Sequence, residues 1–138
     1  MVIGSKVYKK DRCVNSIDWA RANIETATDG SLFIAETHEI TRGRQGRIWE
    51  QAEGQLLLTI LLKPKVIDEI PEEELPVRLN QLNMALALGI VEPLKQYGAI
   101  IKWPNDFSID GKKIAGMLME VVWQDGKVSG LILGLGLN

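Results

Sequence analysis

Three arginines and two glycines fall within the seven residues from Thr41 to Arg47, and Trp49 follows closely. Arginine guanidinium groups hold carboxylate or phosphate oxygens two at a time, and glycine lets the backbone come close to a ligand. The chain carries a formal net charge of −2, so these arginines are not part of a generally basic protein. We interpret residues 41–47, called the arginine loop below, as a clamp for a small, multiply charged anion. An ordinary solvated basic turn is the alternative interpretation.

A second motif, Lys102-Trp-Pro-Asn-Asp106, puts a lysine and an aspartate at a predicted strand end, in reach of one site. The residue before a proline is biased toward extended backbone. Asp106 is of the type that helps to hold Mg²⁺ beside phosphate groups. A turn capped by Asn105 and Asp106 is the structural alternative.

Two more motifs lie in predicted strands. In the segment from Lys112 to Glu120, a period of two puts Lys113, Ala115, Met117 and Met119 on one face. A lysine that points inward from a buried strand is costly unless an anion pairs with it. An exposed hairpin lysine is the alternative, and it suits Lys112 better than Lys113.

The fourth motif is Gly134-Leu-Gly-Leu-Asn138. Glycines within a strand mark a bulge or the close approach of a ligand. The motif lacks the spacing and the following helix of a dinucleotide-binding fingerprint.

The elements that must position these motifs predict an α+β fold. A helix capped at Asn15–Ser16 is expected to run to Asp29-Gly30, and a longer helix is expected from about Pro76 until Pro93 kinks or ends it. Asp110-Gly111 and Asp125-Gly126 are strong hairpin turns and predict an antiparallel meander. We expect a mixed or antiparallel sheet with the helices packed on one face. Strands are predicted at 6–9, 32–36, 55–63, 100–103, 113–123 and 127–137, with an exposed connection at 65–74.

Composition limits the classes of function. The chain has 138 residues, which suits one domain. Its net charge of −2 argues against general binding to nucleic acid or to a membrane surface. Cys13 is the only cysteine, which excludes an internal disulfide and favours a reducing, cytoplasmic location. Because the apolar strand from Val128 stops at Asn138 without a polar tail, we expect an incomplete domain.

In this order and spacing, the four motifs resemble the catalytic domain of a biotin–protein ligase. That family typically has a Gly-Arg-Gly-Arg-x-Gly-Arg loop followed by Trp, then Lys-Trp-Pro-Asn-Asp, a Lys-(Ile/Leu)-(Ala/Gly)-Gly-(Ile/Met)-Leu-x-Glu strand and a Gly-x-Gly-x-Asn strand end. The resemblance runs from about Asn15 to Asn138 and is highly specific as a set. It implies the class II synthetase-like fold of biotin and lipoate ligases over residues 1–138. It also implies that the C-terminal part and any N-terminal DNA-binding domain are missing.

The resemblance implies a two-step reaction. Biotin and ATP, with Mg²⁺, first give biotinyl-adenylate and pyrophosphate. The biotinyl group then passes to one lysine of the biotin carboxyl carrier domain of a carboxylase. The implied partners are therefore biotin, ATP and the carrier domain, without operator DNA or a membrane. A homodimer, formed edge to edge through the exposed end of the last strand, is also implied.

The resemblance also assigns residues to roles. Arg42, Arg44 and Lys113 match the catalytic positions. The positions that match the biotin site are Ser16, Ile17, Asp18, His38, Thr41, Arg42, Gly43, Arg44, Trp49, Lys113 and Gly116. Those around the nucleotide are Arg44, Arg47, Lys102, Asn105, Asp106 and Asn138, with Asp106 as the expected Mg²⁺ ligand. The loop is often mobile in the family without ligand, and we expect the same here.

The chain departs from the family where the biotin head group would bind. Ser16-Ile17-Asp18 stands in place of Ser-Thr-Asn, His38 in place of a glutamine, and Thr41 in place of the first loop glycine. Ile17 removes a hydroxyl and Asp18 adds a negative charge. These departures leave open a ligase for lipoate or another acyl acid. The missing C-terminal part leaves open a second alternative, a non-catalytic ligand-binding remnant.

Overall fold

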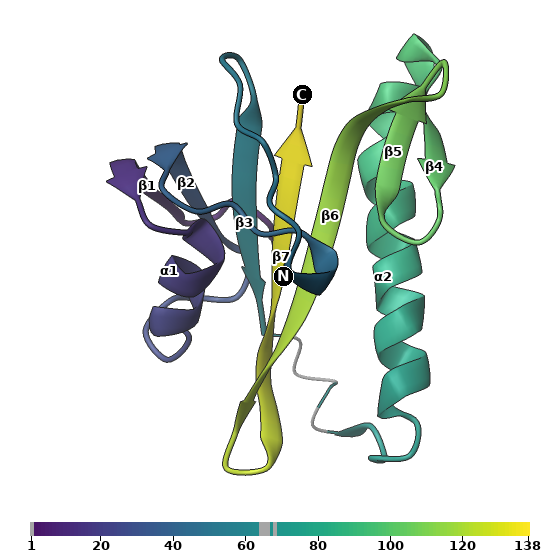
Figure 1. Cartoon of the computed structure of the whole chain (residues 1–138). Helices are drawn as coiled ribbons and strands as arrows, with labels where there is room; N and C mark the ends of the chain where they lie inside the picture. The colour runs from purple at the N-terminus through teal and green to yellow at the C-terminus, as the bar shows by residue number, and fades with distance from the viewer. Residues whose placement is uncertain (1, 64–66, 68) are drawn as a thin grey trace.

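The computed structural model describes residues 2–63, 67 and 69–138. Within them, seven strands form one sheet in the order β1-β2-β3-β7-β6-β5-β4 (Figure 1). β1 and β2 are parallel and all other neighbours are antiparallel, so the sheet is mixed. The α+β class and the C-terminal meander are confirmed. The strands are β1 (Val7–Cys13), β2 (Ser31–His38), β3 (Leu56–Leu62), β4 (Ile100–Lys102), β5 (Asp106–Ile109), β6 (Lys112–Gln124) and β7 (Lys127–Leu137).

The first helix, α1 (Ser16–Ala22), begins where its cap predicts and ends earlier than expected. The side chain of Asn15 accepts hydrogen bonds from the backbone N–H groups of Ile17 and Asp18, at 2.8 and 3.3 Å. After Ala22 the chain continues as turns. Ile24 and Ala27 are nevertheless buried, because the turns keep packing against the same core as α1.

The second helix, α2 (Leu75–Val91), passes into a 3₁₀ turn at Glu92–Tyr97. Pro93 falls at this junction, as expected of a residue that cannot continue an α-helix. Gly98 then ends the segment with a left-handed backbone, at φ 80°. In the expected connection at 65–74, residues 65, 66 and 68 lie outside the described residues, and residues 71–74 are exposed.

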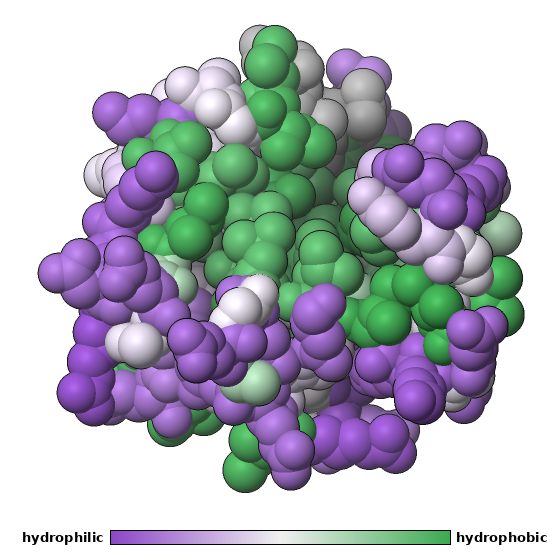
Figure 2. All heavy atoms as spheres, turned by 90° about the horizontal axis from the view of Figure 1, so that it is seen from above, coloured by the Kyte–Doolittle hydropathy of each residue, from purple (hydrophilic) through white to green (hydrophobic). Residues whose placement is uncertain are grey.

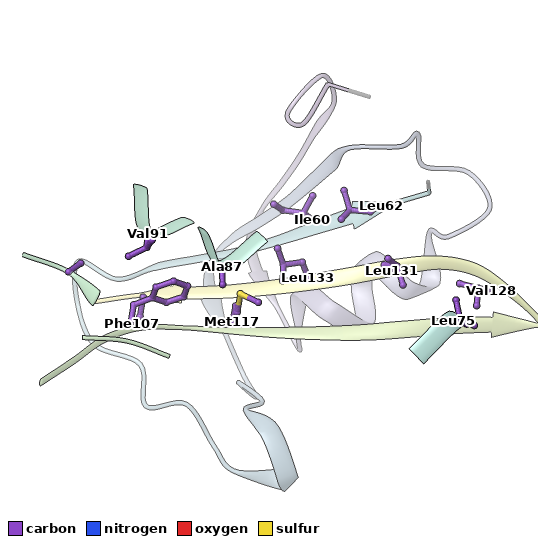
Figure 3. Packing of buried hydrophobic residues seen from close by; sticks show 12 residues of the cluster. Ile60, Leu62, Leu75, Ala87, Val91, Phe107, Met117, Val128, Leu131 and Leu133 are labelled. Carbon is purple, nitrogen blue, oxygen red and sulfur yellow. The ribbon is translucent and has the colours of Figure 1, made fainter. Parts of the chain in front are cut away.

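The two helices lie on opposite faces of the sheet, which corrects the expectation that they share one face. Leu131 and Leu133 of β7 belong to the core cluster of α2, whereas Ile132 between them belongs to the cluster of α1. Figure 3 shows Leu131, Leu133 and Met117 gathered with Ala87 and Val91 of α2. The sequence carried a signal for this arrangement, because an unbroken apolar run is typical of a strand buried on both faces.

A bulge at the start of β6 corrects a second expectation. Phe107 of β5 pairs with Ala115 and Ser108 pairs with Lys113, so Ile114 is an extra residue. The extra residue breaks the period of two, and Lys113 does not share a face with Ala115 and Met117. Those two residues pack in the α2 cluster, whereas Lys113 turns to the side of Gly116, toward α1 and the arginine loop.

The edge strands of the sheet are β1 and β4. β7 is paired along both sides, with β3 and with β6. The end of the last strand, at Asn138, is exposed, and a homodimer stays a prediction. In the part of the chain that the structure describes, no helix combines the length and apolar character needed to cross a membrane.

Figure 2 shows a broad apolar region in the middle of the face seen from above, bordered by polar residues. Large apolar side chains are also exposed along α2, at Val77, Met84 and Leu88.

Phe33 of β2 is, in contrast, fully buried. Its ring stacks on Tyr8 with centroids 4.7 Å apart.

The Phe33→Ala variant is expected to lower the free energy of unfolding by about 3–5 kcal/mol, because it leaves a cavity in the α1 core. Leu88→Ala, at a side chain that is 57% exposed, is expected to change it by less than about 0.5 kcal/mol. Urea denaturation measures both. Equal losses in the two variants would contradict the assigned core.

Candidate active site

A cleft of about 320 Å³ opens on the α1 face of the sheet. Its walls come from the start of α1, the arginine loop and strands β3, β6 and β7. In Figure 1 the segment that follows β2 crosses in front of β3 and β7 and brings the short turn at Arg44–Gly46 beside β6. The cleft therefore collects residues that lie about a hundred positions apart in the sequence.

Glycines form part of the cleft floor. A Cβ atom at Gly116 would lie 2.8 Å from the ring of Trp49, and one at Gly136 would lie 2.9 Å from it. A Cβ atom at Gly134 would lie 2.9 Å from Ile17. Only residues without a side chain let these groups reach the sheet at these points. The glycine motif predicted a close approach, and in this structure Trp49 and Ile17 make it.

The arginine loop is a small hairpin with internal hydrogen bonds. Gly43 N–H donates to Arg47 O at 2.7 Å, and Trp49 N–H donates to Thr41 O at 3.2 Å. The buried Thr41 hydroxyl donates to Trp49 O. Thr41 therefore adds a bond to the base of the loop that glycine could not make.

Four cationic side chains line the cleft, from Arg42, Arg44, Arg47 and Lys113, against a single lining carboxylate, Asp106. Lys113 Nζ lies 2.7 Å from Asp106 Oδ1 and 4.9 Å from the centre of the Trp49 ring. Fixed positive charge of this kind stabilises an anion or a developing negative charge. The arginine loop and β6 thus bring together the cations that the sequence motifs selected.

Two of these cations have further partners. Arg44 Nη1 donates to Asn105 Oδ1 at 3.0 Å. Asn105 Nδ2 in turn donates to Met117 O at 3.1 Å, and Met117 N–H donates to Asn105 O at 2.8 Å. Arg42 is paired with Asp18 in the first turn of α1. The loop is therefore tied to the sheet on one side and to α1 on the other.

The remaining lining of the cleft is uncharged and combines polar side chains with apolar ones such as Ile17. It contains His38 at the end of β2 and the Ser16 and Thr59 hydroxyls, which share a buried hydrogen bond of 2.8 Å. His38 is 7% exposed, and burial lowers the pKa of its imidazole below the ordinary 6.5. The ring is therefore neutral at pH 7.

Three of the residues selected from the sequence do not line the cleft. Asp18 lies at its rim on Arg42. Lys102 is exposed on the short edge strand β4. Asn138 is exposed at the end of the chain, where its Oδ1 accepts a bond of 2.8 Å from Gln55. The other selected residues line it: Ser16, Ile17, His38, Thr41, Arg42, Gly43, Arg44, Arg47, Trp49, Asn105, Asp106, Lys113 and Gly116.

Sequence reasoning missed several residues of the cleft, including Asn15, Thr59, Gly134 and Gly136. The two glycines were noted as a motif but were not assigned to the site. Thr59 carried a signal, since it is the one polar residue within an apolar strand segment.

The comparisons with known proteins identify the family. Residues 7–138 match the model of the biotin/lipoate A/B protein ligase family. The chain belongs to this family. Its relatives within the ligase family include the bifunctional ligase/repressor BirA of Bacillus subtilis, 34% identical over 116 residues. A biotin–[acetyl-CoA-carboxylase] ligase of Mycobacterium tuberculosis is 33% identical over 127 residues.

The solved structures of the ligase family agree with the fold. The biotin protein ligase of Aquifex aeolicus in complex with biotin and ATP superposes with a TM-score of 0.72 at 28% identity, over 97% of this chain and 52% of that one. The match to the Bacillus protein covers 81% of this chain and 33% of that protein. The match to the Mycobacterium protein covers 86% of this chain and 43% of that protein. The chain thus spans about a third to two fifths of the length of these curated relatives.

Proposed function

We propose that this chain carries the acid-activating site of a biotin–protein ligase, which joins biotin to AMP and releases pyrophosphate. The observation that supports this proposal most strongly is the convergence of Arg42, Arg44 and Lys113 on one cleft whose lining divides into charged and uncharged residues. Biotin has a neutral polar head group and a carboxylate at the opposite end, which matches this division. Relatives named biotin–[acetyl-CoA-carboxylase] ligase support the same reaction.

The first step brings two anions together. A biotin carboxylate oxygen attacks the α-phosphorus of ATP, a bond to the α-phosphorus forms, and pyrophosphate leaves. Two guanidinium groups and one ammonium group would reduce the repulsion between the carboxylate and the phosphates. The ammonium group of Lys113 contacts the carboxylate of Asp106 in this structure. When the ligand binds, this ammonium group would leave Asp106 and contact a ligand oxygen instead. No side chain has to donate or accept a proton in this step.

The cleft offers one protein ligand for Mg²⁺, which fits an ion held mainly by the nucleotide. Proteins usually hold Mg²⁺ through one or two carboxylates together with substrate phosphates. Asp106 is the one carboxylate of the cleft lining, and no group of three or more His, Cys, Asp or Glu residues suited to a metal occurs among the described residues. We therefore assign Asp106 as the protein ligand for a nucleotide-bound Mg²⁺, which would neutralise phosphate charge.

The second step and the wider setting extend the proposal. The biotinyl group would pass to a lysine of a biotin carboxyl carrier domain. The buried, unbridged Cys13 suits a cytoplasmic location. A homodimer formed edge to edge through the sheet would use β1 or β4. The proposal covers ligase chemistry alone and does not include the repressor role named for the Bacillus relative.

A lipoate or related acyl ligase is the second candidate. Ile17 puts an apolar side chain, 5% exposed, on the head-group side of the cleft, and that favours an apolar head group. Incubation with ATP, Mg²⁺ and either biotin or lipoate, followed by mass spectrometry of the bound acyl-adenylate, separates the two. We expect the biotinyl-adenylate. Accumulation of the lipoyl product alone would overturn the biotin assignment.

The Asp18→Asn variant is expected to bind biotin up to about fivefold more tightly, because Asp18 competes with the ligand carboxylate for Arg42. The gain is small, since exposed ion pairs contribute about 0.2–1 kcal/mol, and it should shrink at high salt. Calorimetry at two salt concentrations measures it. Asp125→Asn, which makes the same change of charge in the distant β6–β7 turn, is the control. Weaker binding in Asp18→Asn would contradict competition at Arg42.

A further inference from the structure

The face of α2 opposite its buried side is exposed and largely apolar. Its residues recur at intervals of three or four and so form one stripe along the helix. The α2 stripe consists of Val77, Gln81, Met84, Ala85, Leu88 and Gly89. Between Leu79 and Val91 the sequence contains no charged residue, whereas the solvent-facing side of a helix is normally charged or polar. The α2 stripe therefore has the character of an interaction surface.

Gly89 is a second unusual feature of the α2 stripe. Glycine inside a helix destabilises it relative to alanine. A Cβ atom at Gly89 would meet nothing within 4 Å, so no contact among the described residues requires a glycine at this position. Together with Ala85, one turn earlier, Gly89 leaves a shallow place between Met84 and Leu88. Such a place lets the backbone of another helix approach closely.

Charged residues flank the α2 stripe in a self-complementary order. Glu74 and Arg78 stand at its start, joined at 3.2 Å. Glu92 and Lys95 stand at its end, joined at 2.5 Å. The order from start to end is therefore acid, base, stripe, acid, base. All four side chains are more than half exposed, and exposed pairs of this kind contribute little, so they can exchange partners.

Two such helices match when they run in opposite directions. Around a twofold axis at Ala85, Arg78 faces Glu92 of the second copy, because each lies seven positions from Ala85. Glu74 and Lys95 lie eleven and ten positions from Ala85 and face each other in the same way. A parallel arrangement would put like charges side by side, which is unfavourable. The charges thus favour a second copy of this chain in antiparallel orientation.

We propose that the α2 stripe binds the α2 stripe of a second copy of this chain, with the two helices antiparallel about an axis near Ala85. The contact is isologous, since both copies use the same surface. It goes beyond the proposed function, because α2 contributes none of the described residues that line the cleft. It also differs from an edge-to-edge dimer, because it leaves β1 and β4 unpaired.

The size of the surface limits the affinity. A helix of 17 residues is about 25 Å long. One pair of such helices buries less than the roughly 1,200 Å² of a standard stable interface. We therefore expect a weak dimer, with a Kd on the order of 10–100 μM.

Sedimentation equilibrium of the 138-residue chain tests the proposal. The unmodified chain should show a monomer–dimer equilibrium. Leu88→Glu should weaken dimerisation at least about 10-fold, because the twofold axis puts two unpaired carboxylates into an apolar contact. Val7→Glu on β1 and Ile100→Glu on β4 are the controls, at side chains that are 40% and 62% exposed. Each should leave the Kd within about threefold of the value for the unmodified chain.

Exchange of the flanking charges tests the orientation. Arg78→Glu should weaken the dimer about fivefold or more, because each pair occurs twice and attraction becomes repulsion. The double variant Arg78→Glu/Glu92→Arg should recover most of this loss, since the pairs are restored with reversed signs. Both positions are exposed, so folding does not depend on them, and circular dichroism confirms it.

Gly89 separates the interface from the stability of the single chain. Gly89→Leu should raise the urea midpoint of the dilute chain, because leucine favours a helix more than glycine does. The same variant should weaken dimerisation about 10-fold, because the side chain fills the place where the second helix approaches. A variant that is more stable and less dimeric is not expected from a role in folding alone.

The outcomes decide the proposal. A chain that stays monomeric up to about ten times the expected Kd overturns it. A dimer that survives Leu88→Glu, or that Val7→Glu or Ile100→Glu dissociates, places the contact at a sheet edge and also overturns it. A double variant that recovers nothing would rule out the antiparallel orientation. Adenylate formation is a separate measurement, so failure of the proposed function would leave these results unchanged.

Discussion

Replacing Lys113 by alanine is expected to lower the rate of biotinyl-adenylate formation by about 10²- to 10³-fold, the usual effect of removing one fixed electrostatic donor from a reaction centre. The ammonium group is held between Asp106 and the face of Trp49, and it lies over the cleft floor beside Gly116. No neighbouring lysine can replace it, because Lys112 lies at the exposed end of the strand. Single-turnover formation of the adenylate, followed by mass spectrometry, measures the loss.

Lys112→Ala is the matched control for this experiment, since it removes the same charge one residue away and should keep nearly full activity. The Lys113 side chain is 47% exposed, so its loss should change the free energy of unfolding by less than about 1 kcal/mol. Full adenylate formation by a folded Lys113→Ala variant would remove this residue from the mechanism.

Replacing Arg44 by alanine is expected to reduce adenylate formation about 10²-fold. Arg44 lines the cleft and holds the loop to Asn105, so the variant loses both a positive charge and a link between the loop and the sheet. The ratio kcat/KM for ATP, measured by pyrophosphate release, reports the combined effect.

Arg12→Ala is the comparison for Arg44. Arg12 is exposed on β1 and pairs with Glu39 at 3.3 Å, away from the lining of the cleft. Its removal should leave kcat/KM within about twofold of the value for the unmodified chain, because exposed ion pairs contribute little to stability. Equal losses in Arg12→Ala and Arg44→Ala would show a general effect of basic surface charge and would contradict a specific clamp.

Much of the fold was predictable from local signals. The Asn15 cap, Pro93 and the two Asp-Gly turns each fix a boundary through local backbone chemistry, and each boundary was confirmed. The face of the sheet on which each side chain lies was harder to predict. The bulge at Ile114 depends on pairing between β5 and β6, and a one-residue shift moves every later side chain to the other face.

The cations of the arginine loop and Lys113 were predictable, because arginine and lysine bind anions wherever the fold places them, whereas Lys102 of the next motif does not line the cleft. The contacts between those motifs were not predictable. The pairing of Asp18 with Arg42 and the hold of Gln51 on His38 join residues 24 and 13 positions apart. Only the crossing of the loop over the sheet brings them together. The head-group departures at Ile17 and His38 were visible in the sequence, but their burial was not.

The central claim is that one cleft receives a carboxylate and a triphosphate together. Calorimetric titration of the unmodified chain with biotin, with ATP, and with ATP after biotin tests this claim most directly. The account predicts saturable binding of biotin, saturable binding of ATP, and pyrophosphate release only when both are present. A folded chain that gives no saturable heat with either ligand, or that releases pyrophosphate equally without biotin, would contradict it.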